Sequence, residues 1–125
     1  MAYDLNLKIG SFEAAADLSA KQFRVVKMAT GGKVDVFSGA TDVPIGILQN
    51  KPTAGQTAEV ALTGSISKAD SDAALAVGDI VSGQTDGQLE VADAGDYIVG
   101  VVVLASGAAG ELASVLVTCP GIAKA

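Results

Sequence analysis

The chain has 125 residues, a formal net charge of −6 at pH 7, one cysteine and no histidine. This length suits one domain with a single hydrophobic core. The lack of histidine excludes histidine-based triads and histidine zinc sites, and the scattered Lys and Arg residues form no basic stripe for nucleic acid. We therefore expect neither an enzyme nor a cofactor, metal or nucleic-acid site.

The start of the chain and its apolar runs bear on localisation. No apolar run approaches the roughly 20 residues of a membrane helix, so we expect no membrane contact. Asp4 and Lys8 interrupt the first apolar residues, which argues against a signal peptide and favours synthesis in a cytosol. Half of the residues are apolar but only 4% are aromatic. Because aromatic side chains supply much of the burial in small domains, we expect subunit association to add stability.

Residues 1–12 are predicted to form an N-terminal arm. Apolar and polar residues alternate there, which is the pattern of a strand with one apolar face; the apolar positions are Tyr3, Leu5, Leu7 and Ile9. Alternation fixes a face and not a partner. The arm is therefore expected to join a sheet edge either within its own subunit or in a neighbouring chain.

The remainder, residues 13–125, is predicted to be a single all-β domain, a small barrel or sandwich. Two Ala-rich stretches, residues 13–20 and 69–77, are expected to form short helical turns. Glycine-rich turns separate the predicted strands and favour this fold class. Those strands are residues 22–29, 33–37, 44–48, 57–63, 79–82, 88–92, 97–104 and 111–118.

The chain also repeats itself, because residues 18–64 resemble residues 75–121. The match is carried by glycines with similar neighbours, and these pairs are Gly32 with Gly87, Gly46 with Gly100 and Gly55 with Gly110. Two unequal copies argue against a solenoid, which needs several stacked units. The pattern predicts an internal duplication whose halves close around one core.

Two local features suggest other functions. Val26-Lys27-Met28 resembles the lysine site of biotinyl and lipoyl carrier domains, but such a lysine must stand at an exposed hairpin tip, whereas Lys27 falls inside a predicted strand. A carbohydrate-binding surface module would need aromatic platforms, and only Tyr3 and Tyr97 are suitable. Cys119 lies in an apolar segment and is expected to be a buried, inert thiol.

Several segments together resemble the head decoration, or capsid cement, proteins of tailed bacteriophages. They are Phe23-Arg-Val-Val-Lys27, Pro44-Ile-Gly-Ile-Leu-Gln-Asn-Lys-Pro52, the segment from Gly55 to Gly64, and Ala76-Val-Gly-Asp-Ile-Val81 followed by Asp86-Gly87. The resemblance implies a β-rich structural protein of the virion, made in the bacterial cytoplasm and bound to the outer surface of the head. It further implies a homotrimer that braces the joints between subunits of the major capsid protein.

The arm is the candidate contact with the capsid or with a neighbouring subunit. The residues expected to make this contact are Tyr3, Leu5, Leu7, Ile9 and Phe12. Adding a strand to a sheet edge would bury the apolar face of the arm. On this hypothesis, a chain without residues 1–12 folds but does not bind heads.

Overall fold

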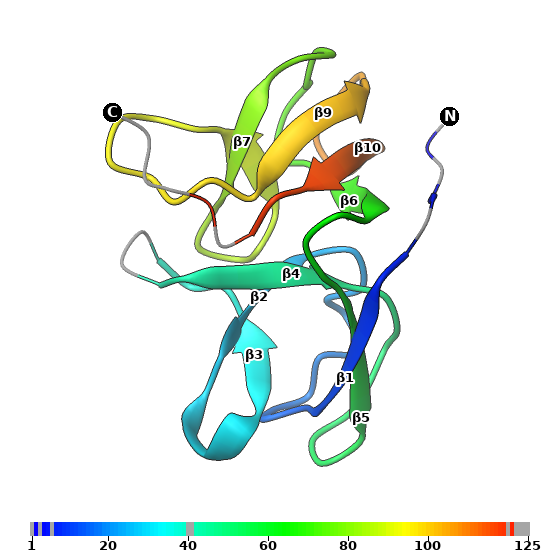
Figure 1. Cartoon of the computed structure of the whole chain (residues 1–125), viewed down its shortest axis with the longest axis vertical. Coiled ribbons are helices and arrows are strands. Elements are labelled where there is room, and N and C mark those ends of the chain that lie inside the picture. The colour runs from blue at the N-terminus through cyan, green and yellow to red at the C-terminus, as the bar shows by residue number, and fades with distance from the viewer. Residues whose placement is uncertain (1, 3, 6, 40–41, 120, 122–125) are drawn as a thin grey trace.

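The fold is all-β, as predicted, and consists of two antiparallel sheets of five strands each (Figure 1). The structure, a computed structural model, describes residues 2, 4–5, 7–39, 42–119 and 121. The strands are β1 (Ile9–Glu13), β2 (Val25–Met28), β3 (Val34–Val36), β4 (Pro44–Leu48), β5 (Thr57–Ala61), β6 (Ile66–Asp70), β7 (Ile80–Gly83), β8 (Leu89–Val91), β9 (Gly100–Leu104) and β10 (Leu112–Val117).

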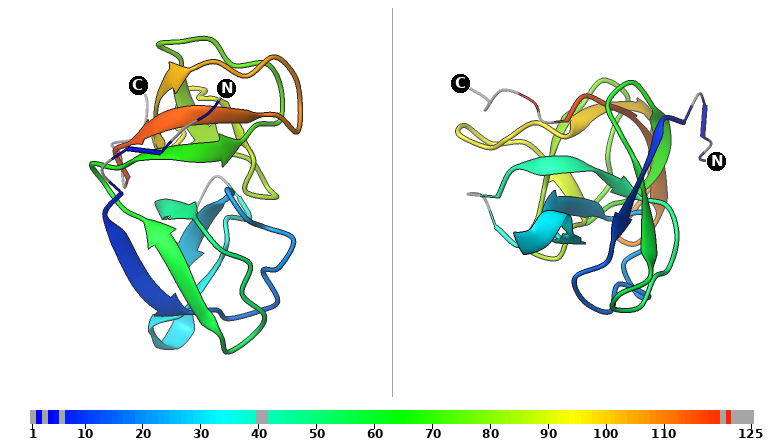
Figure 2. Two further views of the ribbon diagram at one scale, coloured as in Figure 1. Left: turned by 90° about the vertical axis from the view of Figure 1, so that its right-hand side faces the viewer. Right: turned by 60° about the horizontal axis from the view of Figure 1, so that its bottom comes forward.

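The two sheets have the same topology, which confirms the internal duplication. The strand order is β1-β5-β4-β2-β3 in the first half of the chain and β6-β10-β9-β7-β8 in the second. The halves lie one above the other in Figure 1, and the left view of Figure 2 shows the same stacking from the side. The structural repeat also includes β1 and β6, which precede the two segments matched in the sequence.

Each sheet curls so that its two outer strands approach each other. A parallel bridge joins Ala14, just after β1, to Val34 in β3, and the equivalent bridge joins Ser71 to Leu89. The pairing around these bridges is otherwise antiparallel throughout. Each half therefore curls around its own interior.

Glycines carry the sequence repeat because the backbones approach closely at two equivalent points. A Cβ atom on Gly46 would collide with the carbonyl oxygen of Ala61, and one on Gly100 would collide with the carbonyl oxygen of Leu116. Both glycines lie beside the middle of the sheet, where β4 meets β5 and β9 meets β10. Only glycine leaves room for a neighbouring backbone at this distance.

The hydrophobic core divides unequally between the halves. One cluster is local to the first half and contains Ala14, Leu18, Val26, Val34, Leu48, Ala58 and Val60. The other lies mainly in the second half, but it includes three first-half residues, Val25, Phe37 and Ile47. The second half therefore completes its core with side chains from the first.

Polar contacts also join the halves. The Val25 N–H donates to the Gly87 carbonyl at 2.8 Å, and the Arg24 guanidinium lies 3.2 Å from the Asp70 carboxylate. Gly87 has φ +83°, and a Cβ there would also lie 2.9 Å from the Val25 carbonyl oxygen. The junction follows Phe23, a non-glycine residue with positive φ of 65°. Such a conformation is costly and persists only where the surroundings hold it.

The two predicted helical turns are wrong. Residues 13–20 include the end of β1, and residues 69–77 include the end of β6. Ala14 and Ala69 are small residues on the buried side of the curled sheets, so their small size serves packing and not helix formation. In the described part of the chain, the helical element is the short 3₁₀ turn η1 (Thr30–Gly32), which connects β2 to β3. Each predicted strand overlaps an observed one, while β6 was not predicted.

Candidate functional site

The N-terminal arm runs from one half of the molecule to the other and pairs within its own chain. The Leu5 N–H donates to the Ile66 carbonyl at 2.8 Å, and the Ile66 N–H donates back at 3.0 Å. Beside this bridge, the Lys68 N–H donates to the Asp4 carboxylate at 2.7 Å. The arm then continues as β1 along β5 of the first half. Within the single chain, the arm pairs with Ile66 at the start of β6 and with β5.

The arm nevertheless keeps an exposed row of apolar side chains. Leu5 is 48% exposed, Leu7 38% and Ile9 41%. We call these three residues the arm strip. Alternate residues of an extended chain share a face, so the backbone hydrogen bonds hold the strip in place while its side chains face outward. Tyr3, also predicted as a contact residue, lies outside the described residues.

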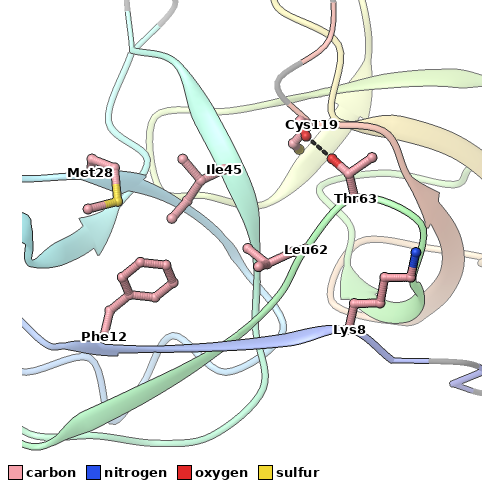
Figure 3. A pocket seen from close by; sticks show the side chains of 7 residues that line it. All are labelled: Lys8, Phe12, Met28, Ile45, Leu62, Thr63 and Cys119. Atoms are coloured by element: carbon pink, nitrogen blue, oxygen red, sulfur yellow. Dashed lines mark hydrogen bonds between the residues drawn. The ribbon is translucent and has the colours of Figure 1, made fainter.

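Phe12 does not belong to the arm strip, although the sequence placed it among the contact residues. It packs against the core of the first half and lines an open groove of about 400 Å³ (Figure 3). The groove is bounded by β1, by the end of β2, by the start of β4 and by the segment after β5. Its lining is mostly apolar and consists of Lys8, Phe12, Met28, Ile45, Leu62, Thr63 and Cys119.

Lys8 supplies the one charge in this lining. Its backbone is fixed, because its N–H donates to the Ser65 hydroxyl at 2.7 Å and its carbonyl accepts from the Leu62 N–H at 2.8 Å. The four ion pairs found among the described residues do not include Lys8. The groove thus has a mostly apolar lining that includes one lysine, whose ammonium group lies near Gly64.

Cys119, which lines the groove beside Thr63, is a structural thiol. Its carbonyl accepts a hydrogen bond from the Thr63 hydroxyl (Figure 3), and its thiol donates to the Val99 carbonyl at 3.3 Å. Burial raises the pKa of Cys119 to about 12. The thiolate is the nucleophilic form of cysteine, so this protonated group is inert at neutral pH, as the sequence predicted.

Lys27 lacks the geometry of a carrier lysine. It lies within β2, and its ammonium group is 2.8 Å from the Ser38 hydroxyl and 3.1 Å from the Asp42 carboxylate. The hydrogen bond from the Ser38 hydroxyl is the main cause that lowers the pKa of Asp42. The hairpin tip that a carrier lysine needs is formed instead by η1. For a sugar site, Tyr97 is half-buried and Tyr3 lies outside the described residues.

Neither a metal-site cluster nor a membrane-spanning helix occurs among the described residues. No group of three or more His, Cys, Asp or Glu residues in this part of the chain has the arrangement of a metal site. No helix formed by these residues is long and apolar enough to cross a membrane.

Sequence reasoning missed three groove residues, Met28, Ile45 and Leu62. Met28 lies in β2, Ile45 in β4 and Leu62 just after β5, and only the fold brings them together beside Phe12 (Figure 3). The repeat contained a usable sign of the groove. The position equivalent to Met28 is Gly83, because each pairs with the same position of the following strand, Val34 and Leu89 respectively. Because one half has a large apolar residue where the other has a glycine, the two halves must pack differently at this position.

No family model and no curated protein sequence matches the chain. Among solved structures, the chain is similar to the N base of the head fiber protein gp8.5 of bacteriophage phi29. The TM-score is 0.71 at 14% sequence identity, and the alignment covers 93% of this chain and 98% of that chain. The likeness shows a common fold over nearly the whole of both chains.

Proposed function

We propose that the protein is a structural component of a phage virion that binds the outer surface of the head. The observation that carries this proposal is the fold, which matches the base of a phage head fiber over 93% of this chain. The sequence resemblance to head decoration proteins supports the same conclusion from different data, the glycine and valine pattern of the chain. Within this proposal, the partner is the major capsid protein.

The arm strip is the proposed contact with the capsid. Fully burying a large aliphatic side chain contributes about 1.5–3 kcal/mol. Leu5, Leu7 and Ile9 are already partly buried, with 48%, 38% and 41% still exposed. Burying the rest of all three would therefore contribute about 2–4 kcal/mol per arm. Because the backbone of the strip is already fixed by Ile66 and by β5, little of this energy is lost to ordering the arm.

A single arm of this strength would hold weakly, and this favours a homotrimer on the head. Linked copies engage together and raise the overall affinity by about 10² to 10⁴ over a single site. A trimer placed over a joint would contact several capsid subunits at once. Bracing of that joint, as in a cement protein, follows from the same geometry.

The structure changes how the arm should be tested. Removal of residues 1–12 would delete most of β1 and take Phe12 out of the first core. Loss of head binding by that truncation would then reflect unfolding. Substitutions in the arm strip leave the backbone pairing intact and separate the two effects.

The experiment compares two triple variants in co-sedimentation with cognate heads that lack the protein. The arm variant is Leu5→Thr, Leu7→Thr and Ile9→Thr. The control is Val77→Thr, Ile80→Thr and Val91→Thr, which changes three exposed apolar residues of the second half. We expect the arm variant to bind at least ten-fold more weakly, as a loss of more than about 1.4 kcal/mol requires, and the control to bind as the wild type does.

Two other outcomes are informative. Undiminished binding by a folded arm variant would remove the strip from the mechanism while leaving the virion role intact. Failure of the wild-type protein to bind such heads would contradict the proposed function itself. The native mass of the purified protein, with that of the head-bound form after release, tests the trimer separately.

A further inference from the structure

The positions that line the groove of the first half have equivalents in the second half, and the residues at the two sets of positions differ in size. The strand register establishes which positions are equivalent. Val26 pairs with Gly46 in the first half, and Val81 pairs with Gly100 in the second, so Val26 corresponds to Val81 and Gly46 to Gly100. In the first half, the positions hold the large residues Phe12, Met28, Ile45 and Leu62. In the second half, they hold the smaller residues Ala69, Gly83, Val99 and Val117.

In the second half, an aromatic side chain from the first half occupies the space between these smaller residues. Phe37 follows β3 and is only 3% exposed. Its ring lies against Gly83, where an added Cβ would be 2.8 Å from the ring. Phe37 shares one buried cluster with Ala69, Val99 and Val117. The protein thus contains one example of an aromatic residue from a strand end docked at this position.

In the first half, no described residue fills the corresponding place, which is the groove of Figure 3. The larger lining residues make it shallower, yet about 400 Å³ remains open. This volume falls within the range of protein pockets that bind small groups. Met28, on its rim, is 42% exposed. Because methionine is unbranched and flexible, an apolar groove with Met28 on its rim adapts readily to a bound side chain.

We propose that this groove binds a phenylalanine side chain presented by an extended segment of another protein, with a carboxylate of that segment beside Lys8. The internal pairing of Phe37 with the equivalent position shows which chemistry fits. The ammonium of Lys8 favours an acidic neighbour, since opposite charges at the edge of an interface steer association. This inference goes beyond the proposed head binding and does not involve the arm strip.

The partner is a different protein and not a second copy of this chain. The sequence has three phenylalanines. Phe12 lines the groove itself, Phe37 is buried, and Phe23 lies under the Lys68 ammonium at 5.8 Å. A second copy therefore presents no freely exposed phenylalanine to the groove. A partner whose exposed segment carries a phenylalanine near an acidic residue meets the requirement.

The probe for this proposal is a capped heptapeptide with the sequence of residues 33–39, Lys-Val-Asp-Val-Phe-Ser-Gly. It contains the internal aromatic residue and a nearby carboxylate. The full chain, labelled at its methyl groups, is titrated with the peptide and followed by NMR. We expect saturable shifts at the methyl groups of Met28, Ile45 and Leu62. We expect none at Val99, because Phe37 already occupies the corresponding site of the second half. A peptide with alanine for phenylalanine should bind at least ten-fold more weakly.

Substitutions at exposed positions locate the binding. Met28→Glu places a carboxylate on the rim of the groove, and Val91→Glu makes the same change at an exposed site of the second half. The first should abolish the peptide-induced shifts and the second should preserve them, with the spectrum of each variant reporting that it is folded. Lys8→Gln should weaken binding by a smaller factor.

Two results would overturn the proposal. One is an absence of shifts at the groove, or equal shifts with the phenylalanine and alanine peptides. The other is a wild-type oligomer whose native mass falls in Met28→Glu but not in Val91→Glu, which would assign the groove to a second copy of the chain.

Discussion

The two halves of the molecule share one topology but differ in how their interiors are completed. The first half closes its core with its own residues and keeps an open groove. The core of the second half includes Val25, Phe37 and Ile47 from the first half, and Phe37 fills the site that corresponds to the groove. The backbone pairing is thus the same in both halves, while the side chains at equivalent positions pack differently. The difference indicates that the second half depends on the first for its stability.

The largest expected effect tests this dependence directly. Phe37→Ala should lower the free energy of unfolding by about 3–5 kcal/mol, because it empties a buried site between the halves. Phe12→Ala, at a half-buried position on the groove, should lower it by about 1–2 kcal/mol, since part of the ring already faces water. Urea unfolding of both variants measures the two losses. Equal losses would show that the open groove is as important for folding as the filled site.

A second test addresses what the halves have in common. Gly46→Ala and Gly100→Ala should each cost about 2–3 kcal/mol, because the new methyl group forces apart two paired strands. Gly39→Ala is the control, since a Cβ there meets no atom within 4 Å. We expect similar losses for the first two variants and almost none for the third in the same unfolding measurement. Unequal losses at Gly46 and Gly100 would show that the sheets differ in rigidity as well as in packing.

The smallest effect concerns a pair of equivalent polar contacts. Lys33 lies 3.0 Å from the Glu13 carboxylate, with side chains 44% and 50% exposed. At the equivalent positions, the Gln88 amide donates to Asp70 at 3.2 Å, and Asp70 also binds Arg24 at the junction.

Lys33→Ala should therefore cost less than about 0.5 kcal/mol, as exposed ion pairs do. Gln88→Ala should cost about 1 kcal/mol, the typical worth of a hydrogen bond in a folded protein. Thermal unfolding at low and high salt measures both losses. At high salt, the melting temperature of the Lys33 variant should approach that of the wild type, whereas that of the Gln88 variant should stay lower. The reverse ranking would contradict the view that the second half is held more tightly at this point.

Much of the fold could be predicted because the decisive residues act locally. Gly46 and Gly100 mark close backbone contacts, and Gly87 marks a turn with positive φ, so glycine spacing revealed the duplication. β6 was missed because its inward positions are Ser67 and Ala69, both fully buried. Small and polar inward residues erase the apolar alternation from which a strand is recognised.

The candidate site was only partly predictable for a related reason. The alternation of Leu5, Leu7 and Ile9 identified an exposed apolar face, since it depends on neighbouring residues alone. The pairing of the arm with its own chain depends on Ile66, which is far away in the sequence. The groove likewise combines residues from distant strands, and no pattern within any one strand reports such an arrangement.

The placement of Phe37 has a consequence for behaviour on dilution. Phe37 and its receiving site belong to one chain, so their contact is intramolecular, and its effective concentration is set by the short path between the halves. Dilution leaves this contact unchanged. The groove of the first half has no such tethered occupant among the described residues, so anything that binds there does so by mass action. The two equivalent sites therefore differ in their response to dilution: the Phe37 contact is independent of protein concentration, whereas binding of the proposed partner in the groove depends on it.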